Sequence, residues 1–108
     1  MITSYVTPQR TMLYLALVGP LDSDSAADLV HEYHERQSQT IRRCILDLGA
    51  VEETDERGLS VLQRLQRIAR TEQVEFSVVA GRSDRAAVVG EAARRYAVPV
   101  VDGRSLPM

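Results

Sequence analysis

Apolar residues follow two patterns along this chain, and the two patterns alternate. In the first pattern, continuous apolar runs occupy three segments, residues 12–18, 41–48 and 74–80. Such runs are typical of strands covered on both faces. A shorter β-favouring run at residues 4–7 ends at Pro8. It predicts an edge strand that pairs with the next strand through a turn near residues 9–10. Residues 98–101 predict another short edge strand.

Between these runs, apolar residues recur at helical spacing in three segments. The first follows the N-cap candidates at residues 23–25 and extends to about Gln37. The second begins near Leu59 and has the clearest apolar stripe. The third is capped by Ser83 and stopped by Pro99. This order of elements predicts an α/β domain whose sheet is mixed and whose helices lie mainly on one side. The stripe of the second helix consists of Leu59, Leu62, Leu65, Ile68 and Ala69.

Length and composition narrow the class of protein. A chain of 108 residues is expected to form one domain, residues 1–108, without a linker. The net charge of -2 argues against nucleic acid as a partner. No apolar run approaches the roughly 20 residues that cross a bilayer, so membrane insertion is not expected. Residues 1–4 lack the features of a secretory signal, which predicts a cytoplasmic protein.

The sequence lacks the residue sets that most catalytic sites need. All thirteen basic residues are arginines, which excludes a P-loop lysine or a Schiff-base lysine. Asp47, near a strand end, lacks the acidic cluster and lysine of a receiver phosphoacceptor, so we expect it to bind loop amides. His31 and His34 lack further metal ligands and are expected at the surface. Cys44, the only cysteine, is expected in the core. We therefore predict no enzyme activity, no metal and no cofactor.

Residues 52–56 place four carboxylates just before the second helix. The positive end of a helix dipole favours such anions, and Asp55 is a natural N-cap. Arg57 breaks this pattern, because a cation in the first turn opposes the dipole. Its simplest explanation is an ion pair with the neighbouring carboxylates. A local rule broken without evident structural gain is also a place to look for function.

Four landmarks, in this order, resemble the STAS domain, the fold of bacterial anti-sigma factor antagonists. Residues 19–22 (Gly-Pro-Leu-Asp) resemble its Gly-x-Leu-Asp, and residues 45–48 resemble its apolar-Asp-Leu strand. Residues 54–59 (Thr-Asp-Glu-Arg-Gly-Leu) lie where the family has Asp-Ser-Ser/Thr-Gly-Leu, and Leu62 continues the Gly-Leu-x-x-Leu pattern. The resemblance implies a mixed sheet of four to five strands with three to four helices, packed mainly on one face.

In that family the hydroxyl residue directly before the glycine is phosphorylated by a partner that is both anti-sigma factor and serine kinase. The added charge of about -2 repels the partner and releases it. The resemblance places Arg57 at this acceptor position and Glu56 at the preceding serine. Arginine has no hydroxyl, so the switch cannot operate there. Thr54 and Ser60 are poorer substitutes, because one precedes Asp55 and the other lies two residues beyond the glycine.

The resemblance implies a regulator that binds an anti-sigma factor or serine kinase-like partner and is not switched at Arg57. An alternative is a scaffold or assembly module in a stress-signalling or transporter-associated complex. There the arginines Arg64, Arg67 and Arg70 would serve self-association, including a homodimer, or a non-kinase partner. A nucleotide-binding role is disfavoured by the missing lysine and Gly-rich loop. The expected partner-binding residues are Asp22, Glu53, Thr54, Asp55, Glu56, Arg57, Gly58, Leu59 and Ser60.

Overall fold

Strands and helices alternate through most of the chain. A computed structural model describes residues 1–79 and 100–101. The predicted third helix, and residues 98–99 of the predicted last strand, lie outside these residues. In the described part the elements are β1 (Ile2–Val6), β2 (Met12–Leu21), α1 (Ser23–Arg36), β3 (Arg43–Thr54), α2 (Glu56–Thr71), β4 (Glu75–Val79) and β5 (Val100–Val101).

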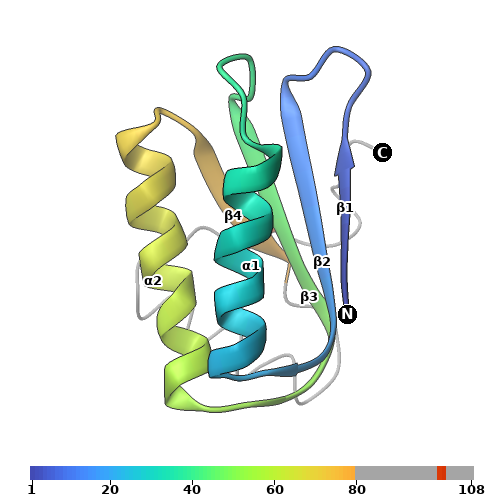
Figure 1. The fold of residues 1–108 in the computed structure, drawn as a ribbon, viewed down its shortest axis with the longest axis vertical. Helices are drawn as coiled ribbons and strands as arrows, with labels where there is room; N and C mark the ends of the chain where they lie inside the picture. Colours follow the sequence, from blue (N-terminus) through green and yellow to red (C-terminus); the bar gives the residue numbers. More distant parts are fainter. Residues whose placement is uncertain (80–99, 102–108) are drawn as a thin grey trace.

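The strands form one sheet in the order β1-β2-β3-β4-β5. β1 runs antiparallel to β2, and every other neighbouring pair is parallel. The crossovers from β2 to β3 and from β3 to β4 step in the same direction, so right-handed connections bring α1 and α2 to the same face. Figure 1 shows the two helices side by side across the sheet, with their N-terminal ends together at the bottom. The predicted mixed sheet with helices on one side is confirmed for the described elements.

The main core fills the space between the sheet and the two helices. Leu29 and Tyr33 of α1, and Leu62 and Leu65 of α2, are fully buried there. Cys44 belongs to the same cluster, as predicted, and burial raises the pKa of its thiol to about 12. Side chains alternate along a strand, so every second residue of β2 and β3 reaches this core. These strand residues are Leu13, Leu15, Leu17, Cys44, Leu46 and Leu48.

The opposite face of the sheet carries a second, smaller cluster. Met12, Ile45 and Val79 are buried in it, and Tyr14 packs against them. These residues occupy the alternate positions of β2, β3 and β4. β2 and β3 are therefore apolar on both faces, which explains their continuous apolar runs in the sequence.

Several elements differ in extent from the prediction. β2 continues through Gly19 and Pro20 to Leu21, whereas the sequence placed its end at Val18. β1 begins at Ile2, two residues before the predicted edge strand. β3 extends to Thr54, not Leu48, because it keeps pairing with β2 as far as Thr54 opposite Leu21. α2 begins at Glu56, three residues before the expected Leu59. The stretch expected as an acidic loop is therefore mostly strand end and helix start. Asp55 is the one residue between β3 and α2.

Candidate functional site

The N-terminal ends of α1 and α2 are both capped by an aspartate. In α1 the N-cap is Asp22, one residue before the expected range 23–25. Its Oδ1 accepts from the Ser25 N–H at 3.0 Å, and its own N–H donates to Ser25 Oγ at 2.9 Å. This is a reciprocal capping box. In α2 the N-cap is Asp55, as predicted, and its Oδ1 accepts from the Gly58 N–H at 2.7 Å.

Close packing of Gly58 on the loop before α1 joins the two helix starts. A Cβ at Gly58 would lie 2.0 Å from the carbonyl oxygen of Leu21 and 3.0 Å from the Asp22 nitrogen. No other amino acid fits this contact without moving backbone atoms. The same Leu21 carbonyl accepts from the Asp55 N–H at 3.3 Å. The glycine of the sequence motif thus serves packing, and it fixes α2 against the end of β2.

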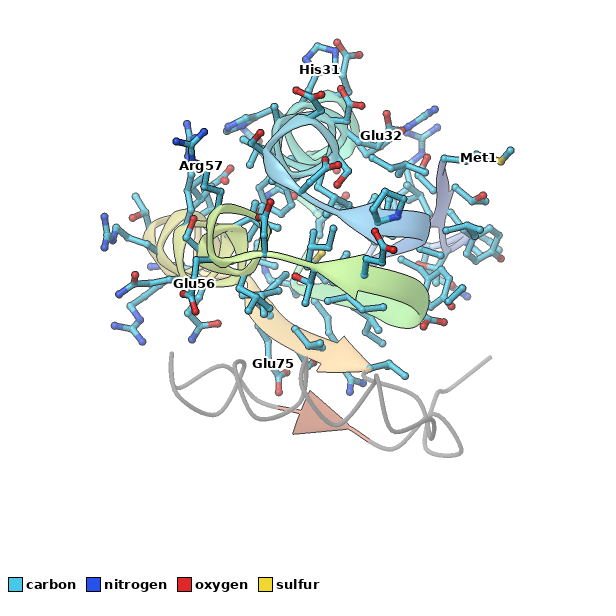
Figure 2. The ribbon with its side chains drawn as sticks, turned by 90° about the horizontal axis from the view of Figure 1, so that it is seen from below. Met1, His31, Glu32, Glu56, Arg57 and Glu75 are labelled. Carbon is cyan, nitrogen blue, oxygen red and sulfur yellow. The ribbon has the colours of Figure 1, made fainter. Side chains whose placement is uncertain are left out.

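Arg57 projects from the first turn of α2 into solvent. Figure 2 shows that Arg57 points to the side of α2 nearer α1, whereas Glu56 points to the opposite side. In the part of the chain that the structure describes, Arg57 forms no ion pair. The predicted pairing with its neighbouring carboxylates is therefore not observed. A free guanidinium remains at the helix start.

The other expected site residues divide into exposed and buried groups. Glu53 and Asp55 are exposed, and Thr54 is half-buried. Ser60 is exposed and its hydroxyl donates to the Arg57 carbonyl at 2.7 Å. Gly58 and Leu59 are buried, so they support the surface and do not form part of it. Pro20 and Leu21, which the sequence did not suggest as site residues, line the site through the strand pairing of β2 with β3.

A shallow depression of about 190 Å³ lies between the two capping residues. Hydrogen bonding from the Ser25 backbone N–H holds the pKa of Asp22 below its ordinary value, so this carboxylate stays ionised. The depression carries the carboxylates of Asp22, Glu53 and Asp55, and Arg57 follows two residues after Asp55 in the first turn of α2. Such a mixed surface suits polar contacts with another protein. Its lining residues are Pro20, Leu21, Asp22, Glu53, Thr54 and Asp55.

The outer faces of the two helices carry opposite charges. On α1, Asp24, Asp28 and Glu35 recur at spacings of four and seven residues, so they share the exposed face. On α2 the exposed face carries arginines, and none of them forms an ion pair with a described residue. The two faces lie next to each other (Figure 1). The arginines of α2 are Arg57, Arg64, Arg67 and Arg70.

Asp47 was expected near a strand end, bound to loop amides, but it lies inside β3 and its hydrogen bonds stay within the sheet. Its Oδ1 accepts from the Gly49 N–H at 2.9 Å. Its Oδ2 accepts from the hydroxyl of Tyr14, a contact that the sequence did not reveal. Burial, and then this hydrogen bond, raise the pKa of Tyr14 to about 12. Asp47 therefore links β3 to β2 on the face of the sheet away from the helices.

The two histidines lie on the exposed side of α1. His31 is exposed and its Nε2 lies 3.4 Å from Glu35 Oε1, and His34 packs edge-on against Tyr33. Among residues 1–79 and 100–101, no group of three or more metal-ligating side chains comes together. In the same part of the chain, no helix is long and apolar enough to span a membrane.

Comparison with known proteins identifies the family. The STAS domain family model matches residues 4–89, so the chain belongs to the STAS domain family. A search of curated protein sequences gives no match.

Solved structures support the same fold at low sequence identity. The anti-sigma factor antagonist SpoIIAA in its unphosphorylated form is 9% identical, with a TM-score of 0.64 over 95% of this chain and 89% of that one. A variant of RsbS from Moorella thermoacetica is 17% identical, with a TM-score of 0.67 over 94% and 86%. The STAS domain of a SulP transporter from Vibrio cholerae is 17% identical, with a TM-score of 0.63 over 92% and 78%. The likeness extends to regulators and to a transporter domain, so it shows the fold and not the partner.

Proposed function

We propose that this STAS domain is a cytoplasmic, non-enzymatic regulator that binds an anti-sigma factor of the serine kinase type. The contact surface would be the exposed residues at the start of α2, together with Asp22 at the start of α1. In this proposal the partner is not released by phosphorylation at the family position, because Arg57 stands there. The regulator would therefore stay competent for binding wherever the kinase is active.

The position of Arg57 is the observation that supports this proposal most strongly. The scaffold around it is intact, since both helices are capped and Gly58 packs on Leu21. The side chain itself is exposed and forms no ion pair with the described residues. Arg57 therefore has no packing or ion-pair role among the described residues. A free cation on an otherwise conventional helix start instead suits a carboxylate on a binding partner.

Binding to kinase-type anti-sigma factors from the host organism tests the contact surface. Each purified factor would be titrated with the wild-type protein and with Arg57→Glu by isothermal titration calorimetry. Reversing the charge of a contact arginine should weaken binding at least about tenfold. Arg70→Glu is the matched control, because it makes the same change in the last turn of the same helix. Equal effects of the two variants would contradict a contact at the helix start.

Phosphorylation is tested separately with the factor that binds. Incubated with that kinase and ATP, the wild-type protein should take up no phosphate on residues 52–60, and Arg57→Ser should become phosphorylated. Mass spectrometry of the peptide identifies the site. Stoichiometric phosphate on Thr54 or Ser60 of the wild-type protein would overturn the proposal that this surface is not switched.

A second candidate function is a scaffold or assembly module in a multiprotein stress-signalling or transporter-associated complex. The four arginines of α2, which form no ion pair with a described residue, favour it, because a basic helix face suits an acidic neighbour in an assembly. In that case kinase-type factors would not bind. A pull-down from host extract would instead recover partners that Arg64→Glu/Arg67→Glu fails to retain.

A further inference from the structure

Among the described strands, none pairs with the outer edge of β1. In residues 1–79 and 100–101, β1 lies at one end of the sheet order and its neighbour is β2. In the described part of the chain, α1 is the helix that contacts β1, and it does so from one face of the sheet. Figure 2 shows β1 at the far side of the molecule from α2. This edge is therefore remote from the surface around Arg57.

The hydrogen bonds at the start of β1 show which backbone groups point outward. Met1 and Val18 exchange two backbone bonds, each of 2.9 Å, so they form a hydrogen-bonded pair. Pairs in an antiparallel ladder alternate, so Thr3 and Tyr5 also bond inward to β2. The N–H and C=O groups of the residues between them point away from β2. These outward residues are Ile2, Ser4 and Val6.

The exposed apolar side chains gather at the same edge. Within residues 1–79, the large hydrophobic residues that stay exposed are Met1 at 88%, Val18 at 52% and Tyr5 at 48%. Met1 lies opposite Val18 of β2. Tyr5 lies four residues further along the chain from Met1 and on the same face of the sheet, because side chains alternate along a strand. β1 (Ile-Thr-Ser-Tyr-Val) contains no charge, proline or bulge, the usual devices that prevent edge pairing. Backbone groups that have no partner in the described residues thus coincide with exposed apolar surface.

We propose that β1 pairs with β1 of a second copy of this chain, antiparallel and about a two-fold axis at Ser4. In this register Ser4 faces Ser4 of the second copy, and Ile2 faces Val6 of the second copy. Each of these is a hydrogen-bonded pair, because the outward groups of both strands then meet. The two sheets become one continuous sheet, with the helices of both copies on the same face.

The sequence of β1 is what selects a second copy as the occupant. Any extended peptide can bond to free backbone groups, but this strand is self-complementary about its central residue. Ile2 and Val6 pair two branched apolar side chains. Thr3 and Tyr5 pair a β-branched side chain with an aromatic one, a favourable cross-strand combination. Tyr5 of each copy also lies diagonally from the other Tyr5, within reach of an aromatic ring. The proposal does not depend on which protein binds near Arg57.

Ser4→Pro is the sharpest variant for this interface. The Ser4 N–H points outward, so proline there removes a bond to the second copy and none between β1 and β2. Sedimentation equilibrium should show a dimer for the wild-type protein. It should show a dimer dissociation constant raised at least about tenfold for Ser4→Pro. Ser4→Ala is the matched control: it also removes the 2.8 Å hydrogen bond from Ser4 Oγ to Glu32, but it keeps the N–H and should still dimerise.

Two further variants keep the test decisive if proline disturbs folding. Thr3→Lys/Tyr5→Lys changes exposed positions and places like charges opposite each other across the interface, so it should abolish the dimer. Thr3→Cys/Tyr5→Cys should form a disulfide-linked dimer in oxidised glutathione, because these positions face each other in the proposed register. Thr3→Cys alone should not, since its opposite residue keeps its tyrosine. Circular dichroism confirms the fold of each variant.

A wild-type protein that stays monomeric at high-micromolar concentration would overturn the proposal. So would a dimer that Thr3→Lys/Tyr5→Lys leaves intact, because the contact would then lie elsewhere. A covalent dimer formed as readily by Thr3→Cys alone as by the double variant would overturn the proposed register.

Discussion

At the scale of single residues, the hydrogen bond between Tyr14 and Asp47 shows how the fold changes the properties of a side chain. It contributes to the raised pKa of Tyr14 and joins two segments that are distant in the sequence. The two residues are 33 positions apart, and the register of β2 with β3 places them diagonally on one sheet face. No sequence pattern relates them. The sequence placed Asp47 near a strand end, whereas it lies inside β3, and its tyrosine partner depends on a pairing register that only the folded sheet defines.

The raised pKa of Tyr14 predicts a loss of stability at high pH. In the unfolded chain the phenol has an ordinary pKa of 10.0, and in the folded protein burial and Asp47 raise it to about 12. Below pH 10 both states are protonated and the full contribution is present. Between about pH 10 and 12 only the unfolded chain ionises, so the free energy of unfolding falls as pH rises.

Urea unfolding of the wild-type protein and Tyr14→Phe at a series of pH values measures this effect. The wild-type free energy of unfolding should fall more steeply through this window. Tyr33, whose pKa burial also raises, is present in both proteins and cancels in the comparison. Parallel curves would show that Tyr14 ionises normally in the folded state.

At the scale of elements, the attachment of α2 to the loop before α1 depends on a missing side chain. Gly58 has the backbone of Leu21 directly against it. A Cβ there meets backbone atoms, which cannot turn aside as a flexible side chain would. The start of α2, and with it the position of Arg57, is therefore held in place at this contact.

Gly58→Ala should destabilise the domain despite the better helix propensity of alanine. Overpacking typically costs about 1–3 kcal/mol, and the propensity gain of roughly 1 kcal/mol offsets only part of a clash with backbone. Because the clash is with backbone, we expect a net loss of about 1–2 kcal/mol in the free energy of unfolding, measured with urea. Gln63→Ala, at an exposed position of the same helix, should change it by less than about 0.5 kcal/mol. A fully stable Gly58→Ala would mean that α2 shifts freely at this end.

The element boundaries show where sequence patterns suffice and where they do not. Apolar periodicity placed both described helices and the strands, because each element has one or two faces to bury. The end of β3 was missed because residues 52–54 are polar, and pairing with Leu21 keeps them in the strand regardless. The capping box of α1 did carry a signal, since Asp22 and Ser25 have the required spacing. The motif around Gly58 located the candidate site in the sequence. The shape of the site depends on how the fold brings the two helix starts together.

At the scale of the whole molecule, Cys44 offers a single internal reporter of folding. It lies on β3, in the middle of the sheet, and is fully buried in the main core. Burial raises its thiol pKa to about 12, so the reactive thiolate is scarce as well as inaccessible. Its exposure requires the sheet and both helices to separate.

The thiol should therefore react with Ellman's reagent only when the domain opens. At mildly alkaline pH the reaction of the native protein should be slow, and its rate should rise with urea in step with the loss of helical circular dichroism. Rapid stoichiometric reaction in the absence of urea would show that β3 becomes accessible without global unfolding.

The division of charge between the two helices has a consequence for how the molecule meets another protein. The acidic outer face of α1 and the basic outer face of α2 lie beside each other, so the pair forms a permanent dipole across this side of the domain. The field of such a dipole turns an approaching charged surface before any atoms touch. Association through this side should therefore begin with the two proteins already aligned. Salt would slow the encounter more than it would loosen the finished complex.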